Sequence, residues 1–492
     1  MKNKVYYLYG AAIQGIQNFI FQTNDLKDIV GASELVEEIC TTAFEEFIEG
    51  QEPILHAAGN IKQLFQSKEA CEKAVRYFPA KVMNIAPGIT ISQAVVAFDD
   101  GNFEAAANRL EQELRIQRNR PTASMTLGLM GMVRSRKTGL PAVCEEEGDY
   151  YDSASRKKRE VVGKAHYSLC QKSFGIPNLK DRIAYDIGEI ASGNNWIAIV
   201  HADGNGLGNV VRQIGRQADV LKDFSFALNK ATCESAQEAF KAVESKFRDS
   251  KFIPIRPIVL GGDDMTIVIR GDLAMEYTKS YLETFEQKTK VLFGEIVAQH
   301  PDLNKSQRDI LNAGLTACAG IAFIKSSYPF YYGYDLAESL CARAKKDAKG
   351  FDSRRAPSCL MFHKVQDSFV EDYEEIVERE LIPCAGNTFV FGPYYLESCV
   401  PPLRWSVNEL LSEVDLLDSA EGNAVKSGLR QWMTLLHDKG EEGARQKKER
   451  MLSLLENEKL RNLVEKVIDE EGKRHAVYDV LSLRSIYQTS NK

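Results

Sequence analysis

The alternation of apolar and polar positions predicts five elements in the first part of the chain. They are a strand at residues 4–9, a helix over roughly 32–48, a hairpin within 53–65, a helix over roughly 67–85 and a strand at 89–98. The helices show apolar residues at helical spacing, whereas the strands are short apolar runs. The predicted order is therefore strand, helix, hairpin, helix, strand.

The same order recurs later in the chain. A strand is predicted at residues 196–202, a helical region over roughly 207–247, a hairpin at 255–269, a helix near 274–297 and a strand at 315–323. The run VYYLYGAAIQGIQ from Val5 aligns without gaps with WIAIVHADGNGLG from Trp196. We interpret this as an internal duplication, with chance similarity of two β-α-β units as the alternative.

The hairpin of the second copy has the sequence IRPIVLGGDDMTIVI. Two β-branched runs flank Gly261-Gly262-Asp263-Asp264, so the tip of a hairpin should present two adjacent carboxylates. The missing side chains of Gly261 and Gly262 leave room for a ligand. An ordinary acidic turn is the alternative, because Asp and Gly dominate turns for conformational reasons.

The first strand of the second copy ends in Asp203 and a glycine-rich turn, Gly204-x-Gly206-x-Gly208. A strand-end carboxylate facing the hairpin carboxylates suits a divalent-metal site for phosphoryl transfer. Hard oxygen ligands favour Mg²⁺ or Mn²⁺ over zinc. The N–H groups of the turn can hold phosphate, although a glycine-rich turn by itself is a weak signal.

A triphosphate also needs positive charge, and the run AESLCARAKKDAK offers Lys345 and Lys349. The two lysines are one helical turn apart and share a helix face. A solvated lysine pair is the alternative. His201 should share the side of the strand on which Asp203 lies, and we expect it to be a core histidine or to support a ligand.

The first copy lacks the carboxylates. Ala12 stands where Asp203 stands, and Ala58-Gly59-Asn60-Ile61 stands opposite the Gly-Gly-Asp-Asp turn. The chemistry is therefore expected in the second copy, with the first copy as the wall of its nucleotide site. A Gly31-Ala32-Ser33 turn at a helix start makes Ser33 a candidate nucleotide contact.

An insert at about residues 120–190 separates the two copies and carries charge runs of both signs. Basic runs lie at 134–137 and 156–159, and an acidic run lies at 145–147. Neighbouring runs of opposite sign usually indicate a solvated loop, with a nucleic-acid or partner contact as the alternative. After the second copy, the pattern predicts an edge strand at 358–365 and helices at 408–417, 425–437 and within 441–469.

Composition narrows the class of protein. The 492 residues are enough for about three domains, and 44% hydrophobic and 27% charged residues are ordinary for a soluble globular protein. A net charge of −7 does not indicate a nucleic-acid binder, and no apolar run approaches the ~20 residues of a membrane span. The ten cysteines contain no Cys-x-x-Cys pair, and free thiols indicate a reducing cytoplasm.

These motifs together resemble the polymerase subunit of type III CRISPR effector complexes, in a type III-B-like form. The run IQNFIFQTNDLKDIVGASELVEEI from Ile16 is similar to the first palm of that family. The resemblance implies an α+β fold with two ferredoxin-like palms of the GGDEF/polymerase type and a C-terminal helical domain. The expected domains are a degenerate palm at 1–118, an insert at 119–190, a catalytic palm at 191–368 and a helical domain at 369–492.

The family resemblance also implies an activity. Binding of target RNA by the assembled complex switches on the second palm, which makes a nucleotide second messenger from ATP. The product is usually a cyclic oligoadenylate, although some relatives join AMP to S-adenosylmethionine. The implied partners are other complex subunits, guide RNA and target RNA. Metal ligands would be Asp203, Asp263 and Asp264; nucleotide contacts would be Gly204, Gly206, Gly261, Gly262, Lys345, Lys349 and Ser33.

The sequence departs from the family pattern in three places. The chain starts at the palm, so we expect no His-Asp nuclease domain and no cleavage of single-stranded DNA. The insert holds only Cys144 and Cys170, so a structural zinc is not expected, and Asn205 stands where some relatives have an acidic residue. Two other functions stay open: a non-catalytic scaffold subunit, and a stand-alone GGDEF-type cyclase that uses GTP.

Overall fold

A computed structural model of the chain describes residues 5–48, 53–57, 59–99, 102–120, 130–146, 148–163, 168–177, 179, 181–193, 195–214, 217–366, 372–384 and 386–490. Ala58 and Glu147, which belong to runs discussed above, lie outside these residues. The chain divides into two compact units. One comprises Met1–Glu189, Gly206–Ile267 and Thr284–Leu315, and the other Ile190–Asn205, Val268–Glu283 and Thr316–Lys492. The four predicted domain ranges stay a prediction.

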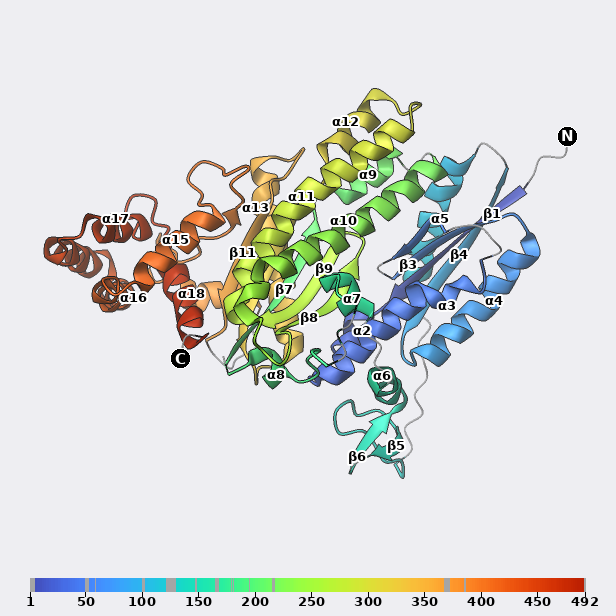
Figure 1. Ribbon diagram of the computed structural model, residues 1–492, viewed down its shortest axis with the longest axis horizontal. Coiled ribbons are helices and arrows are strands. Elements are labelled where there is room, and N and C mark those ends of the chain that lie inside the picture. Colours follow the sequence, from blue (N-terminus) through green and yellow to red (C-terminus); the bar gives the residue numbers. More distant parts are fainter. Residues whose placement is uncertain are drawn as a thin grey trace. The chain divides into compact units, whose positions relative to one another are not determined.

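The first copy forms a four-stranded antiparallel sheet in the order β2-β3-β1-β4 (Figure 1). Its strands are β1 (Val5–Gln14), β2 (Leu55–Ala57), β3 (Asn60–Phe65) and β4 (Thr90–Asp99). Successive residues of β1 point to opposite faces. Leu8 packs with Leu110 and Leu114, whereas the Tyr9 ring stacks 5.6 Å from the Phe44 ring. Both faces of this sheet are therefore covered.

The helices of the first copy are α1 (Ile16–Ile20), α2 (Leu26–Cys40), α3 (Thr42–Glu45), α4 (Lys68–Ile85) and α5 (Phe103–Arg118). The predicted helix start near residue 32 is wrong, because α2 begins six residues earlier. Asp25 caps its N-terminus by accepting a hydrogen bond from the Lys27 backbone at 3.0 Å. Gly31, Ala32 and Ser33 consequently lie inside the helix and form no turn at its start.

The second copy belongs to a six-stranded sheet in the order β12-β11-β10-β7-β9-β8. Its strands are β7 (Trp196–Gly204), β8 (Ile255–Gly261), β9 (Asp264–Arg270), β10 (Ala317–Lys325), β11 (Cys359–Lys364) and β12 (Tyr394–Tyr395). The order β8-β9-β7-β10 repeats the order β2-β3-β1-β4 of the first copy. The two copies therefore share one topology, as the sequence repeat predicts.

The predicted edge strand at 358–365 is present as β11, but it is not the edge. It pairs in parallel with β10, and the short strand β12 pairs with its other side. The helices of this part are α9 (Leu207–Ile214), α10 (Ala218–Glu244), α11 (Ala274–Gln299), α12 (Lys305–Ala313) and α13 (Phe330–Phe351). The long helical region predicted from residue 207 is thus two helices.

The insert has secondary structure of its own. It contains β5 (Ala142–Glu146), β6 (Asp149–Asp152), α6 (Ser153–Gly163), α7 (Ser168–Phe174) and α8 (Ile187–Ala191). Helix α6 packs so closely on α2 that a Cβ atom on Gly31 would lie 2.1 Å from the Lys158 carbonyl oxygen. The predicted solvated loop is therefore wrong for the basic run at 156–159, which lies on this packed helix.

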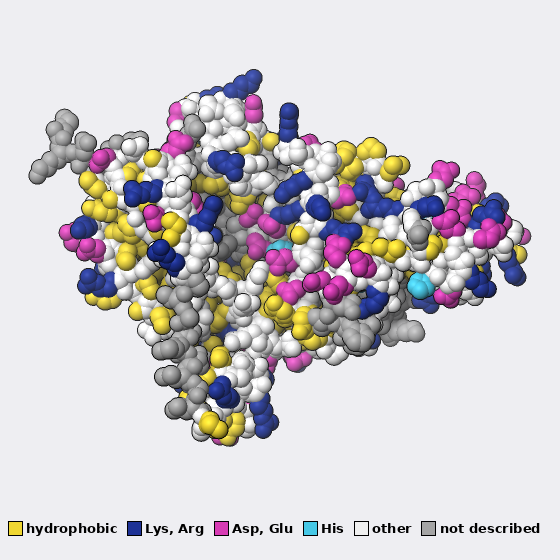
Figure 2. Space-filling model, turned by 180° about the vertical axis from the view of Figure 1, so that it is seen from behind, with side chains coloured by type: hydrophobic (Ala, Val, Ile, Leu, Met, Phe, Trp, Pro, Cys, Tyr) yellow, Lys and Arg dark blue, Asp and Glu magenta, His cyan; other side chains and the backbone are white. Residues whose placement is uncertain are grey.

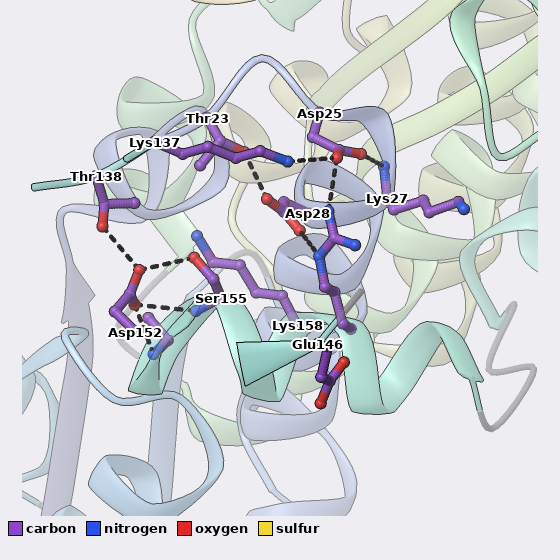
Figure 3. A network of polar contacts seen from close by, with 12 residues as sticks. Thr23, Asp25, Lys27, Asp28, Lys137, Thr138, Glu146, Asp152, Ser155 and Lys158 are labelled. Carbon is purple, nitrogen blue, oxygen red and sulfur yellow. Dashed lines mark hydrogen bonds and ion pairs between the residues drawn. The ribbon is translucent and has the colours of Figure 1, made fainter. Parts of the chain in front are cut away.

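Ion pairs and hydrogen bonds connect α6 to α2 and to the loop before it (Figure 3). Arg159 Nε lies 2.9 Å from Asp28 Oδ1, and Arg159 Nη2 lies 2.6 Å from Asp25 Oδ2. The buried Lys158 ammonium donates to the Phe19 carbonyl at 2.6 Å, and burial lowers the pKa of Lys158 to about 8. Asp152 accepts hydrogen bonds from the Ala154 and Ser155 backbones and so caps α6.

The C-terminal part is mostly helical after residue 406. It contains α15 (Val407–Asp418), α16 (Asn423–Leu454), α17 (Glu458–Val467) and α18 (Val477–Ser490), preceded by the short α14 (Tyr373–Ile376). Gly440, with φ of 68°, interrupts α16. Across the described surface drawn in Figure 2, basic and acidic side chains are interspersed. None of the helices in the described ranges combines the length and apolar character that a membrane span requires.

Candidate functional site

Strand β7 carries Asp203 to the end of the sheet. The strand is buried along its apolar length and pairs with β10, with Cys318 opposite Asp203. At the strand end, the Asp203 side chain is 40% exposed. The fold therefore places one carboxylate at the boundary between a rigid strand and solvent, where a ligand can reach it.

Helix α13 brings Lys345 to this carboxylate. The Lys345 ammonium contacts Asp203 Oδ2 and donates a hydrogen bond to the Gly204 carbonyl oxygen at 2.9 Å. The Lys345 side chain is only 16% exposed. Asp203, Gly204 and Lys345 are thus brought together at the strand end, and their roles in metal and nucleotide binding stay predictions.

A glycine in β10 allows α13 to lie this close to the sheet. A Cβ atom on Gly320 would lie 1.9 Å from the Ala337 carbonyl oxygen and 2.5 Å from the Cys341 nitrogen, both in the α13 backbone. The sequence reasoning missed Gly320. A glycine inside an apolar strand is, however, a known sign of close backbone approach.

Asn205 follows the Asp203-Gly204 pair and points into the interior. Its backbone N–H donates to the Thr316 carbonyl at 2.7 Å, and its Nδ2 donates to Thr316 Oγ1 at 3.1 Å. Nδ2 also lies 3.3 Å from Cys318 Sγ, and Oδ1 is buried with no hydrogen-bond partner among the described residues. Asn205 therefore anchors the backbone beside the site, a role that the sequence reasoning missed.

Three cysteine thiols lie close to one another near Asn205. Cys318 Sγ and Cys359 Sγ are 3.6 Å apart, and Cys341 Sγ donates to the Cys318 carbonyl at 3.2 Å. Burial raises the pKa of the Cys359 thiol well above its usual value. Cys318 and Cys341 are free thiols and are buried, as is Cys40 on α2.

The predicted Gly-Gly-Asp-Asp hairpin is present. Strands β8 and β9 are joined by a two-residue turn, Gly262-Asp263, in which Gly262 has a φ of 63° that favours glycine. Thr232 Oγ1 on α10 donates to the Gly262 carbonyl at 2.6 Å and holds the turn. Gly261, Gly262, Asp263 and Asp264 therefore lie together at one hairpin tip, and both Asp side chains are half-buried.

The glycine-rich turn after β7 is open. Gly206 has a φ of 78°, and a Cβ atom on Gly206 or Gly208 would meet no atom of the described residues within 4 Å. Helix α9 begins directly after this turn, at Leu207. The turn thus leaves space beside a helix start, and Gly204 and Gly206 stay predicted phosphate contacts.

The remaining predicted residues lie in different surroundings. Lys349 is exposed one turn after Lys345 on α13. Ser33 is 3% exposed, and its hydroxyl donates to the Ile29 carbonyl at 3.0 Å within α2. A nucleotide contact by Ser33 stays a prediction, but Ser33 lies inside α2 and not in the predicted turn. His201 is buried as expected, and burial lowers its pKa.

The oxygen atoms at the end of β7 are suitable ligands for a hard cation. A carboxylate oxygen and a backbone carbonyl oxygen converge on the Lys345 ammonium, and both are ligands that Mg²⁺ prefers. Within the described ranges, no group of three or more His, Cys, Asp or Glu side chains is gathered closely enough to hold a metal ion. The part of the site around Asp203 therefore fits a cation through two oxygens, with a lysine beside them.

Comparison with known proteins finds a family to which this part of the chain is similar. Residues 196–353 match the model of the second palm domain of Cas10/Cmr2. These residues are similar to a Cas10/Cmr2 palm domain. The match confirms the predicted resemblance to the polymerase subunit of type III effectors, and the α+β architecture is confirmed as well. A search of curated proteins finds no match.

Solved structures share the fold over the whole chain. A Csm1–Csm4 cassette in complex with cA4 aligns with a TM-score of 0.59 at 14% identity, covering 100% of this chain and 70% of the other. A Csm1–Csm4 subcomplex of the type III-A interference complex aligns with a TM-score of 0.57 at 14% identity, covering 99% and 70%. A cassette with one ATP aligns with a TM-score of 0.56 at 14% identity, also covering 99% and 70%. The III-B-like subtype stays a prediction.

Proposed function

We propose that this chain is the nucleotidyltransferase subunit of a type III CRISPR complex and makes a nucleotide second messenger from ATP. The observation that carries the proposal is the convergence of Asp203, the Gly204 carbonyl and Lys345 at a strand end inside the Cas10/Cmr2-type palm. Structures that share the fold are described with ATP, AMPPNP and cA4. These ligands support ATP as the substrate of this chain.

Asp203, Asp263 and Asp264 are the proposed holders of Mg²⁺ or Mn²⁺. In the first copy, Ala12 pairs with Asn60, and these positions align with Asp203 and Asp263. When bound, the metal would polarise the phosphates and the attacking 3′-hydroxyl.

The remaining residues bind and orient the nucleotide in this proposal. Lys345 and Lys349 would offset the charge of the triphosphate, and the open turn at Gly204 and Gly206 would offer N–H donors to phosphate. Gly261 and Gly262 would leave room for the nucleotide at the hairpin tip. Each group is thus assigned to positioning or charge compensation, the two tasks that dominate phosphoryl transfer.

The proposed partners follow from the same family. The similar structures are of Csm1–Csm4 pairs, one of them from a type III-A interference complex. We therefore propose that this chain assembles with other type III subunits and that guide RNA and target RNA act on it through the complex. The expected product is a cyclic oligoadenylate, with AMP joined to S-adenosylmethionine as the variant to test.

The experiment is product analysis by mass spectrometry on the assembled complex with ATP, Mn²⁺ and target RNA. We expect an adenylate product that requires target RNA and is lost when Asp263 and Asp264 are both replaced by Asn. Asp309→Asn, an exposed carboxylate on α12, is the matched control and should keep the product. An unchanged product in the double variant contradicts the proposal.

Additional arms of this experiment separate the other functions. No product under any condition, with an intact complex, supports the non-catalytic scaffold. A product from GTP by the chain alone supports a GGDEF-type cyclase. Adding S-adenosylmethionine to the ATP reaction distinguishes conjugation from cyclisation, because only conjugation yields a product that contains the methionine group.

A further inference from the structure

The most informative contact outside the proposed reaction steps is the one between Lys345 and the oxygens at the end of β7. We infer that the Lys345 ammonium is an internal cation that occupies the metal position on Asp203 and leaves it when a triphosphate binds. The inference rests on the proposed function, since it concerns the regulation of the same site. It predicts that metal and nucleotide bind cooperatively.

The geometry places the ammonium where a metal would be held. Lys345 Nζ contacts Asp203 Oδ2 and the Gly204 carbonyl oxygen, which is 2.9 Å away. Carboxylate and backbone carbonyl oxygens are also the ligands of hard divalent cations. An ammonium and a divalent cation carry charges of the same sign, so they cannot both occupy this pair of oxygens without strong repulsion.

The Gly204 carbonyl oxygen is held in place independently of the lysine. The Asn205 backbone donates to Thr316 at 2.7 Å, and the Asn205 amide donates to the Thr316 hydroxyl, which in turn donates to the Ala356 carbonyl at 2.6 Å. These contacts fix the chain directly after the Gly204 carbonyl. Withdrawal of the ammonium would therefore leave the Gly204 carbonyl in position for another cation beside the Asp203 carboxylate.

The Lys345 ammonium can move by rotation of its side chain while the helix backbone stays in place. Close packing between Gly320 and α13 locks the helix, while the four-carbon side chain of Lys345 rotates about flexible bonds. A triphosphate offers several anionic oxygens and attracts the ammonium more strongly than one carboxylate that is 40% exposed. Movement of Lys345 toward the phosphates would then open the position on Asp203 to a metal ion.

This exchange has a thermodynamic consequence. A nucleotide that removes the competing ammonium raises the affinity for metal, and the metal must raise the affinity for nucleotide by the same factor. In the absence of nucleotide, the chain should bind metal weakly. Competition between the Lys345 ammonium and the metal would limit metal binding in the absence of ATP, so that the complete site forms only around ATP.

The test is Mn²⁺ binding to the full-length chain without nucleotide, measured by electron paramagnetic resonance of free Mn²⁺. Lys345→Gln should bind Mn²⁺ roughly three- to thirtyfold more tightly than the wild type, because the competing charge is gone. Lys345→Arg keeps the charge and should remain as weak as the wild type. Lys346→Gln, an exposed neighbour on the same helix, controls for the general loss of a positive charge and should change the affinity by less than about twofold.

Steady-state kinetics supply a second readout, since the dependence of the rate on Mn²⁺ and on ATP can be measured separately. In the assembled complex, Lys345→Gln should lower the Mn²⁺ concentration for half-maximal rate and raise the KM for ATP. A lysine with a purely structural role would not move these two quantities in opposite directions. Circular dichroism of each variant checks that the fold is retained.

The outcomes separate this inference from the proposed function. Equal Mn²⁺ affinity in the wild type and Lys345→Gln overturns the inference, while loss of binding in Asp203→Asn would still support the metal site. Equal gains in Lys345→Gln and Lys346→Gln also overturn it, because general electrostatics would then explain the effect. Mn²⁺ binding that Asp203→Asn leaves unchanged contradicts the proposed metal site itself.

Discussion

Gly320→Ala should displace the helix that carries Lys345. A Cβ atom at this position would lie 1.9 Å from the Ala337 carbonyl oxygen, whereas real Cβ contacts are at least 3.0 Å. Helix α13 must therefore retreat by about 1 Å, because the obstacle is backbone and cannot rotate away. Overpacking costs about 1–3 kcal/mol, and a backbone clash of this size belongs at the upper end, near 3 kcal/mol.

The same displacement should reduce activity. Lys345 is carried on the displaced helix, and a shift of about 1 Å in a positioning group can cost roughly a hundredfold in rate. Gly350→Ala is the matched control, because Gly350 lies on the same helix and no atom in the described part of the chain is within 4 Å of its Cβ position. That substitution should leave activity unchanged and raise stability by up to about 1 kcal/mol.

The assay for Gly320→Ala is urea unfolding followed by circular dichroism, together with the rate of ATP use by the assembled complex. A lower unfolding midpoint with an unchanged slope indicates a loss of native stability. An unchanged midpoint would refute the argument from close packing. A lower unfolding midpoint with full activity would refute the argument that the position of α13 against β10 controls the site.

Two further substitutions test the insert and the buried acid of α18. Arg159→Met leaves Asp28, whose side chain is 0% exposed, without its counter-ion, so the free energy of unfolding measured in urea should fall by about 2–4 kcal/mol. The control Lys157→Met, on the exposed side of α6, should lower it by less than about 0.5 kcal/mol. Equal effects of the two would contradict the assigned contacts. Burial raises the pKa of Asp479, beside the Tyr394 hydroxyl, to about 7. The unfolded chain releases this proton near pH 4, so stability falls as the pH rises from about 4 to 7, and Asp479→Asn should gain roughly 2 kcal/mol over the wild type between pH 5 and pH 8. A pH-independent difference would show that Asp479 is ionised in the folded protein.

The repeated palm topology was predictable because strands and hairpins carry local signals. β-branched runs and Gly-Asp turns indicate strands and hairpins without reference to distant residues. The start of α2 was not predictable from apolar periodicity. Residues 28–35 are buried on all sides, because the core covers one face of the helix and α6 another. A helix covered on both sides loses the alternation that marks its boundaries.

The insert shows the same limit for charge patterns. The basic run at 156–159 indicates a solvated segment when the sequence is considered alone. In the fold, Arg159 neutralises Asp25 and Asp28, more than a hundred positions earlier in the chain. Ion pairing between segments so far apart in sequence depends on the tertiary fold, and no local pattern reports it.

In the site, residue types were easier to predict than their partners. The strand-end Asp203 and the lysine helix follow from motif and spacing. The contact between Lys345 and Asp203, and the inward orientation of Asn205, depend on how closely α13 and β10 pack. That packing depends on Gly320, a single residue whose significance appears only when the opposing backbone is known.

Release of pyrophosphate from ATP tests the central claim most directly. Nucleotidyl transfer breaks the bond between the α- and β-phosphates and releases pyrophosphate with either acceptor, so the measurement does not depend on the identity of the product. We predict that the assembled complex with target RNA and Mn²⁺ releases pyrophosphate and that Asp203→Asn abolishes the release. Release of inorganic phosphate alone, or equal pyrophosphate release by Asp203→Asn, would contradict the account.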